Sequence, residues 1–466
     1  MIPLDGKNYA EWYLDIVEKA GLSDKRYPIK GMNVWTPYGW KIMRSIDGFI
    51  RDELDDTGHD EVCFPLLIPE TEFKKEKDHI KGFDSEVYWV TKAGDNELDV
   101  PLVVRPTSET AMYPMFSLWI RSHQDLPLKI YQIVNTFRYE TKQTRPFIRV
   151  REIHFFESHT CHDTEEDAQR QIDEDLSILE KVMDRLCLPY FLLKRTDWDK
   201  FPGAHYTVGI DTVMPNYRTL QLGSVHHYRT NFSVPYDITY EDESGEHKHV
   251  HQTTYGMSER LLGAVISVHG DDKGLVMPPD IAPYQVVIIP IISKKNAEEV
   301  KLEAEKIALI LRESGVRTHL DNRDDRPGSK FYDWEIKGVP LRLELGARDI
   351  ENEVITFARR DNGEKGTISS DSLVSGVRLI LAEIKKDMRS KAEAFQASSV
   401  LPIGSLDDVP ERVVTFPWCG SVECGGKVEE KDIKILGTPY PAEKHEGKCL
   451  VCGKRSELLA YAARSM

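Results

Sequence analysis

Apolar residues recur along the chain with two different periods, and the period predicts the kind of element. Spacings of three and four residues predict amphipathic helices, whereas alternation and short apolar runs predict strands. Both kinds occur in the first 283 residues, which predicts a domain of class α+β with helices around a largely antiparallel sheet. Its predicted elements are a helix at 38–57, a strand at 61–69, a strand followed by a helix within 101–122, mostly strands from 127 to about 233, a helix around 165–186, and a helix from Ser258 to Val268.

The pattern changes after residue 283. The next predicted elements are a strand at 286–291, an amphipathic helix at 296–315 and a second strand at 316–322. Alternation of strands and helices is typical of α/β units, so we expect a separate α/β domain at 284–395. A linker-like stretch at 397–410 leads to the cysteine-bearing end of the chain, so a third, small α+β domain is predicted at 396–466.

Composition narrows the class of protein. The chain has 466 residues, 40% hydrophobic and 30% charged, which is a globular composition long enough for two or three domains. No apolar run is long enough to span a bilayer, and residues 1–20 lack the features of a secretory signal, so we expect a cytoplasmic protein without a membrane partner. A net charge of −16 excludes indiscriminate coating of nucleic acid but leaves a specific RNA partner open.

Four of the seven cysteines lie close together near the end of the chain. Cys419 and Cys424 form one pair, and Cys449 and Cys452 form the other. Glycines after three of them allow the backbone to turn around a tetrahedral ion. Two disulfides or four free thiols are the alternatives, and a reducing cytosol disfavours disulfides. The spacing therefore predicts a structural Zn²⁺ site.

Residues 135–160 concentrate arginines and aromatic rings in an otherwise acidic chain. Read with a period of two, one face of this stretch carries Phe147, Arg149, Arg151, Ile153, Phe155, Glu157 and His159. Arg138 and Glu140 are predicted on the preceding strand, so a hairpin would gather these groups on one surface. Arginine matches phosphate oxygens with its planar fork, and a ring offers a face to a base. The alternative is an exposed strand with surface ion pairs, which contribute little to stability.

Three further stretches carry groups of the same kind. They are Thr107 and Glu109 at a strand-to-helix turn, Gln221, Ser224 and His226 on a strand-like stretch, and Ser258 and Arg260 at the start of a helix, with Ser258 as its predicted N-cap. A helix N-terminus favours an anion. Each group is ordinary alone, as a cap, a core histidine or a surface arginine. Together they predict a nucleotide-binding site at strand ends.

In this order the motifs resemble those of class II aminoacyl-tRNA synthetases, and specifically the prolyl-tRNA synthetase family of archaeal and eukaryotic type. "VCFPLLIP" resembles the first class motif, "FRYE" with "RPFIRVREIHFFE" the second, and "YGMSERLLGAVISVHGDDKGLVMPPDIAP" the third. "RPTSET", "DKFPGAHYT" and "HHYRTNFS" resemble the prolyl family rather than the class alone. The resemblance covers nearly the whole chain and implies a class II fold with a homodimer interface at Pro65.

The resemblance also implies roles for individual residues. The implied ATP-binding residues are Arg138, Glu140, Phe147, Arg149, Gln221, Ser224 and Arg260, with Phe147 stacked on adenine. The implied proline-binding residues are Thr107, Glu109, Arg138, Phe155, Glu157, His159, His226 and Ser258. Arg138 and Arg260 are the implied catalytic residues, and ATP is implied to bind with Mg²⁺. The implied reaction forms prolyl-adenylate from L-proline and ATP and transfers proline to tRNA(Pro), which positioning and charge neutralisation achieve without a protein nucleophile.

The second domain resembles an anticodon-binding module. Glu335, Arg342, Arg348 and Asp349 match positions that read the anticodon in the family. Carboxylates accept from the Watson–Crick donors of guanine, and arginine reaches its acceptors. Without the first domain, a surface helix and strand with paired charges would be the preferred interpretation.

Two rival functions remain open at this point. One is a sister synthetase for threonine, serine, glycine or histidine, which the prolyl-like blocks disfavour. The other is an inactive RNA-binding regulator, which the retained Arg138 and Arg260 disfavour. About forty residues separate His159 from Trp198, too few for the editing insertion of bacterial relatives, so no editing domain in cis is expected.

Overall fold

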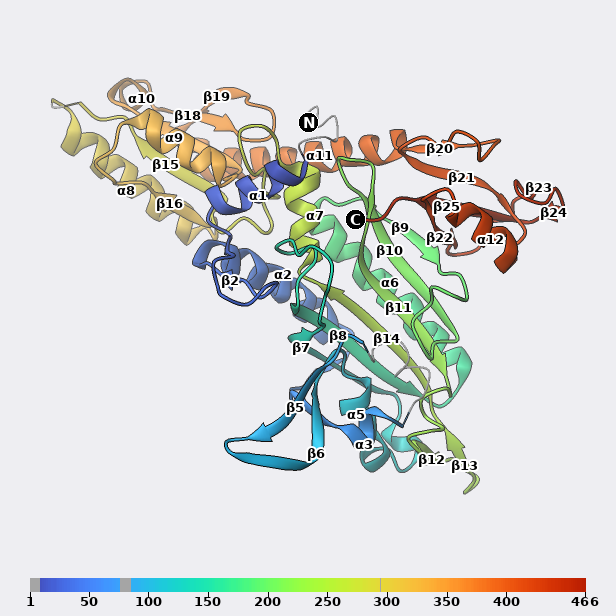
Figure 1. Cartoon of the computed structure of the whole chain (residues 1–466). Coiled ribbons are helices and arrows are strands. Elements are labelled where there is room, and N and C mark those ends of the chain that lie inside the picture. The colour runs from blue at the N-terminus through green and yellow to red at the C-terminus, as the bar shows by residue number, and fades with distance from the viewer. Residues whose placement is uncertain (1–8, 76–84, 294) are drawn as a thin grey trace.

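A computed structural model describes residues 9–75, 85–293 and 295–466. Figure 1 shows the α/β domain and the C-terminal part on opposite sides of the molecule, with helix α11 (Leu373–Ser398) running between them above the largest part. The mixture of a mainly antiparallel sheet, an α/β domain and a small C-terminal part confirms the predicted α+β class.

One large sheet organises most of the chain. Its strands lie in the order β20 (Val400–Pro402), β21 (Val413–Trp418), β25 (Leu458–Ala463), β22 (Lys434–Pro439), β9 (Phe191–Lys194), β10 (Tyr206–Val213), β11 (Thr219–Arg229), β14 (His251–Ser258), β8 (Glu152–His162), β7 (Leu128–Phe137) and β3 (Asp60–Glu61). All neighbours from β9 to β7 are antiparallel, as predicted. Strand β3 at the edge runs parallel to β7.

The C-terminal part continues this sheet. Thr438 of β22 pairs with Lys194 of β9, and Gly437 comes so close to the backbone of Lys194 that a Cβ there would lie 2.2 Å from its carbonyl oxygen. The predicted linker at 397–410 is partly wrong, because its first residues complete α11 and the next ones form β20, which pairs with β21. The C-terminal part is joined to the first domain by backbone hydrogen bonds.

Helices cover the first domain where apolar spacing predicted them. The helices of this domain are α1 (Tyr9–Lys19), α2 (Pro37–Asp56), α3 (Glu70–Phe73), α5 (Glu109–Trp119), α6 (Glu165–Leu186) and α7 (Arg260–His269). The smaller strands are β1 (Ser23–Asp24), β2 (Val34–Trp35), β4 (Leu67–Pro69), β5 (Tyr88–Ala93), β6 (Asn96–Val104), β12 (Thr239–Glu241) and β13 (His247–His249). The predicted strand at 61–69 is thus two short strands, β3 and β4. No helix of the described residues combines the length and apolar character needed to cross a membrane.

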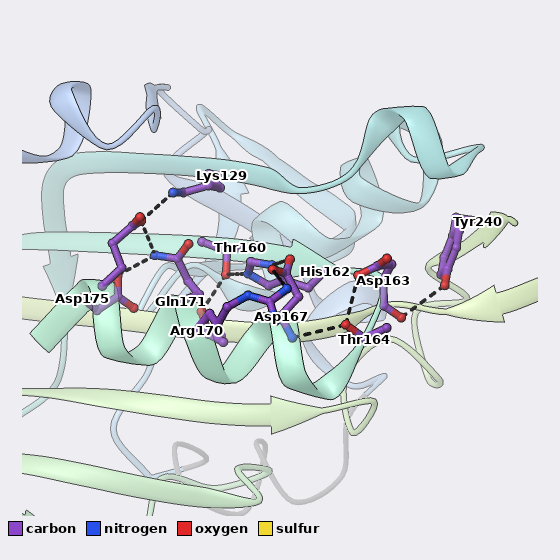
Figure 2. A network of polar contacts seen from close by, with 12 residues as sticks. Lys129, Thr160, His162, Asp163, Thr164, Asp167, Arg170, Gln171, Asp175 and Tyr240 are labelled. Carbon is purple, nitrogen blue, oxygen red and sulfur yellow. Dashed lines mark hydrogen bonds and ion pairs between the residues drawn. The ribbon is translucent and has the colours of Figure 1, made fainter. Parts of the chain in front are cut away.

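A buried polar network fastens α6 to the sheet (Figure 2). His162 of β8 contacts Asp167 in the first turn of α6 at 2.6 Å, and the Thr164 hydroxyl caps the helix by accepting the N–H of Asp167. Further along α6, Gln171 donates to Asp175 at 2.9 Å, and burial raises the pKa of Asp175 to about 8. The contact between His162 and Asp167 joins β8 to the start of α6, whereas the bonds made by Thr164 and Gln171 stabilise the helix itself.

The second domain has its own five-stranded sheet and core. Its strand order is β16 (Thr318–Leu320), β15 (Val286–Pro290), β17 (Leu341–Leu345), β18 (Val354–Arg359) and β19 (Lys365–Ser369). Its helices are α8 (Ala297–Glu313), α9 (Pro327–Ile336), α10 (Ala347–Glu351) and the first part of α11. The first three strands are parallel and the last two antiparallel. This arrangement agrees with the predicted α/β domain.

Candidate active site

A cavity of about 400 Å³ opens on the sheet between the first domain's hairpin and α7. Side chains at alternate positions of β8, β14 and β11 point into it, as the period-two geometry of strands requires. The predicted residues that line the cavity are Thr107, Glu109, Arg138, Glu140, Phe147, Arg149, Phe155, Glu157, Gln221, Ser224, His226, Ser258 and Arg260. His159 is the one predicted active-site residue that does not line it.

The hairpin differs from its prediction in one respect. Strand β8 begins at Glu152, so the alternation of side chains does not extend back to Phe147. Phe147 lies instead in a turn, with a positive φ of 61°. The centroid of its ring lies 4.7 Å from the centroid of the Trp35 ring. Arg138 likewise follows the end of β7 rather than lying within it. The turn nevertheless brings both residues to the cavity wall.

One end of the cavity is built around the carboxylate of Glu109. This side chain is 1% exposed and lies in the first turn of α5, where the helix dipole favours negative charge. Tyr228 donates its hydroxyl at 2.8 Å to one carboxylate oxygen, and the Thr107 hydroxyl donates to the other. A buried carboxylate fixed in this way is a binding group for a small cation.

A second buried carboxylate, that of Glu157, lies at the same end. Burial raises its pKa, but hydrogen bonds from His159, Ser108 and Gln132 outweigh burial and leave the pKa below its usual range. His159 contributes from behind, with its Nε2 atom 3.1 Å from the Glu157 carboxylate and its side chain fully buried. His159 does not line the cavity, so its contact with the amino acid stays a prediction.

Neutral groups close this end of the cavity. Burial lowers the pKa of His226 to about 3, so its ring is uncharged, and it contacts the hydroxyls of Thr207 and Ser224 at 2.9 Å each. A Cβ at Gly256 would lie 2.9 Å from the ring of Phe155. The space beside the two carboxylates is thus narrow and suits a small side chain.

Guanidinium groups gather at the other end. Burial and the charges of Arg138 and Arg149 lower the pKa of Arg260 to about 10. Arg260 is held by the carbonyl oxygens of Ile148 and Gln221 at 2.9 and 3.1 Å. The three guanidinium groups are half-buried, and their mutual repulsion makes this end a site for a polyanion.

The helix start beside Arg260 also differs from its prediction. Ser258 is the last residue of β14, and Glu259 takes the N-cap position of α7. The Ser258 hydroxyl still accepts the backbone N–H of Arg260 at 3.3 Å. Burial raises the pKa of Glu259 to about 8.

Several lining residues were not predicted from the sequence. Arg195 crosses over Gly209, where any Cβ would lie 2.1 Å from its guanidinium carbon, and it forms an ion pair with Asp211 at 2.7 Å. It also donates to the carbonyl of Leu436 in the C-terminal part. Lys200 lines the cavity from the "DKFPGAHYT" block, whose likeness to the prolyl family was the signal available in the sequence.

The end of the described chain contacts Arg149 of the cavity wall. Arg149 donates to the main-chain oxygen of Met466 at 2.7 Å, and the N–H of Met466 donates to Thr219. Met466 also packs against the core of the first domain. The C-terminal part therefore contacts the polyanion end as well as continuing the sheet.

The four clustered cysteines meet in space. One sulfur atom from each of Cys419, Cys424, Cys449 and Cys452 lies within 4.8 Å of all the others. The Sγ atoms of Cys419 and Cys452 are 3.9 Å apart. A tetrahedral Zn²⁺ with bonds of about 2.3 Å separates its sulfurs by about 3.8 Å, so the residues fit that ion.

The four predicted anticodon residues separate into two groups. Glu335 and Arg342 line one hollow at the edge of the second domain. Arg348 and Asp349 lie on α10 instead, where the Asp349 carboxylate accepts the N–H of Gly346 and the hydroxyl of Thr356. Asp349 thus has a structural task at the start of α10.

Comparisons with known proteins agree with these features. Residues 88–269 match the model of the tRNA synthetase class II core domain (G, H, P, S and T), residues 285–379 that of the anticodon binding domain, and residues 406–466 that of the prolyl-tRNA synthetase C-terminal domain. The proline–tRNA ligase of Thermococcus kodakarensis is 56% identical over 98% of both chains. The chain belongs to the prolyl-tRNA synthetase family. The family member from Methanosarcina mazei is 51% identical, covering 98% of this chain and 97% of its own.

A solved prolyl-tRNA synthetase has the same fold. The structure from Giardia lamblia, in complex with prolyl-adenylate, matches with a TM-score of 0.95 at 37% identity over 98% of both chains. Between β8 and β9 the present chain has only α6 as regular structure, so no inserted editing domain is present there.

Proposed function

We propose that the protein activates L-proline with ATP to prolyl-adenylate and transfers proline to the 3′ end of tRNA(Pro). The observation that carries this proposal is the cavity itself, in which two buried carboxylates face a group of arginines in a chain of this family. A zwitterionic amino acid needs a carboxylate to bind its ammonium group and an arginine to bind its carboxylate. ATP needs arginines to bind its phosphates. Acylation of a tRNA(Pro) transcript by labelled proline tests the proposal, and absence of product with active tRNA would contradict it.

The acidic end binds the amino acid. The Glu109 carboxylate, fixed by Thr107 and Tyr228, accepts the secondary ammonium of proline. Phe155 and the neutral His226 enclose the ring, and Ser258 borders it. Glu157 adds a second negative charge, and His159 acts as a positioning residue that orients Glu157 through the 3.1 Å contact. Arg138, between the two ends, holds the carboxylate of proline.

The basic end binds ATP. Arg138 and Arg260 neutralise the phosphates, since their permanent charges and planar forks match phosphate oxygens. Phe147, backed by Trp35, offers a surface for adenine, with Glu140 and Arg149 beside it. Gln221 and Ser224 border the nucleotide from β11.

The chemistry then follows from position. The proline carboxylate attacks the α-phosphate of ATP, the bond from the α-phosphate to the bridging oxygen breaks, and pyrophosphate leaves. The tRNA hydroxyl attacks the resulting carbonyl, and AMP leaves. The protein supplies no nucleophile. Arg138 and Arg260 stabilise the charge that develops on the phosphoryl oxygens, which is the main source of rate in such sites.

Magnesium is expected to accompany ATP. Mg²⁺ takes oxygen ligands and is usually held by one or two carboxylates together with substrate phosphates. The carboxylate of Glu140 lines the cavity and fits this requirement. The bound ion would add positive charge at the phosphates.

The cysteine cluster is proposed to hold a structural Zn²⁺. It lies beside β23 (Gly447–Lys448) and β24 (Arg455–Ser456), far from α7 in Figure 1. The four cysteines are not joined by disulfides. Since four thiolates leave no open position for a substrate, the site suits a structural ion rather than a catalytic one.

Replacing Cys449 by Ser is expected to lower the zinc content from about one ion per chain towards zero. Zinc binding contributes folding energy to small domains, so the C-terminal part should also become more sensitive to protease. Atomic absorption on the purified protein and limited proteolysis measure both effects. Cys63→Ser, at an exposed cysteine outside the cluster, is the control. An unchanged zinc ratio in Cys449→Ser would exclude the four-cysteine site.

A homodimer is proposed through the surface around β3 and β4. Leu66, Leu67, Leu118 and Trp119 are between 40% and 55% exposed there, beside the exposed Pro65. Apolar side chains grouped beside an edge strand are typical of an interface. Light scattering should give twice the chain mass of 53.4 kDa, and Leu66→Asp with Leu118→Asp should shift the protein to monomer. A monomeric wild type at micromolar concentration would contradict the proposal.

The second domain is proposed to bind the anticodon of tRNA(Pro). Glu335 and Arg342 in one hollow offer an acceptor and donors to a guanine, and Arg348 and Asp349 lie on the neighbouring α10. A cytoplasmic location is proposed on the family's role in translation.

A further inference from the structure

The hollow that holds Glu335 and Arg342 lies between two domains. Its volume is about 110 Å³. Its lining includes Lys273, which follows the last residue of α7, His269, and so belongs to the first domain. Five basic side chains and one carboxylate line the hollow, in a chain of net charge −16. Basic groups therefore outnumber acidic groups in the lining, although Arg342, Arg359 and Arg360 form ion pairs with carboxylates outside it.

Lys273 differs from the arginines around it. The two arginines are held by different carboxylates. Arg359 forms an ion pair with Asp387 at 2.6 Å, and Arg360 forms one with Asp271 at 2.5 Å. The Lys273 ammonium lies 3.4 Å from the Glu335 carboxylate, and its side chain is 58% exposed. An ion pair this exposed contributes at most about 1 kcal/mol to stability, so Lys273 separates from Glu335 at little cost.

The backbone of Lys273 is nevertheless held in place. The Asp271 carboxylate accepts the N–H groups of Lys273 and Gly274, at 3.0 and 3.1 Å, while Arg360 binds both of its oxygens. At Gly274, where φ is 144°, a Cβ would lie 2.5 Å from the Cα of Ile336. The turn that carries Lys273 is thus pressed against the end of α9, next to Glu335.

Binding of a guanine changes the surroundings of Lys273. A guanine that donates its N1–H and amino group to Glu335 occupies the carboxylate that holds the ammonium in the protein alone. The compact charge on the flexible Lys273 side chain then loses its acidic partner, because Glu335 is the only acidic residue among the described ones that line the hollow. A phosphate beside the bound base would supply the compensating negative charge.

We propose that Lys273 is a tRNA-binding residue, through which the first domain contacts a phosphate of the anticodon loop beside the base read by Glu335. This inference rests on the proposed function of the second domain as an anticodon reader. It places the anticodon site across the boundary between two domains rather than within one. Lys273 contributes affinity that does not depend on the base sequence, whereas Glu335 contributes specificity.

The test measures binding of a tRNA(Pro) transcript at several salt concentrations by filter retention. Lys273→Ala should weaken binding roughly three- to tenfold at low salt, and should reduce the slope of log K against log[salt] by about 0.7, the value for one phosphate contact to a single strand. Lys273→Arg should retain the slope. Lys306→Ala is the matched control, because Lys306 is 65% exposed and pairs with Glu303 at 3.1 Å. Exchange of pyrophosphate without tRNA should be unchanged in all three.

The outcomes separate the possible failures. An unchanged salt slope in Lys273→Ala, with weaker discrimination at the anticodon guanines, would mean that Lys273 only orients Glu335, and would overturn the inference. If Lys273→Ala bound tRNA(Pro) as tightly as Lys306→Ala does, the inference would also be overturned. Failure of the proposed function is visible in the wild type, as binding that ignores substitution of the anticodon guanines, and it would overturn both.

Discussion

Arg138→Ala is expected to reduce proline-dependent exchange of pyrophosphate with ATP by at least about 10²–10³-fold. Losing one preorganised charge of this kind costs about that much in rate, and we propose that Arg138 contacts both substrates. The residue follows the end of β7, where its Nε atom donates to the carbonyl of Pro106 at 3.0 Å and fixes the direction of the guanidinium group. Initial exchange rates at saturating ATP and proline measure the effect.

Controls distinguish lost chemistry from lost structure. Arg145→Ala removes a guanidinium from the same hairpin but outside the cavity lining, 5.7 Å from the ring of Tyr9, and should keep exchange within about threefold. Thermal unfolding and tRNA binding of Arg138→Ala should remain close to those of the wild type. If Arg138→Ala exchanged pyrophosphate with ATP near the wild-type rate, Arg138 would have no role in adenylate formation.

Glu109→Gln should raise the KM for proline by about 10- to 150-fold. The change keeps the size of the side chain and leaves an oxygen for Tyr228 or Thr107, but it removes the charge that attracts the ammonium of proline. A hydrogen bond to a charged group contributes about 1.5–3 kcal/mol, which corresponds to this range. The KM for ATP should change little, since the arginines lie at the other end.

Glu53→Gln is the matched control for Glu109→Gln. Glu53 is also a buried carboxylate, 8% exposed on α2, but it pairs with Lys181 and does not line the cavity. Its substitution should leave the KM for proline unchanged. An unaltered KM in Glu109→Gln would show that another group binds the ammonium.

Local pattern predicted the helices well and the sheet connections poorly. The helix predicted around 165–186 is α6, because Thr164 supplies a cap at one end and Cys187 adopts a left-handed conformation at the other. The pairing of β22 with β9 joins residues more than two hundred positions apart. Nothing local records such a contact, so the C-terminal part was expected as a separate module.

The same distinction applies to the active site. Residues with an evident motif were predicted, and the cavity gathers nearly all of them. Phe147 was placed on a strand face because alternation was carried through a stretch that turns at φ 61°. The resemblance to the prolyl family implied that His159 contacts the amino acid, whereas in the structure its side chain is fully buried and contacts Glu157. Arg195 was missed because its position depends on the closely approaching Gly209 on the neighbouring strand.

The most direct test of the whole account is exchange of pyrophosphate with ATP against a panel of single amino acids. The account predicts exchange that is strongest with proline, because the narrow pocket beside Glu109 and Glu157 suits a small ring with a secondary ammonium group. Strongest exchange with threonine, serine, glycine or histidine would contradict the proposed substrate. No exchange with any amino acid, with tRNA present, would contradict the proposed reaction and favour a protein that binds RNA without acylating it.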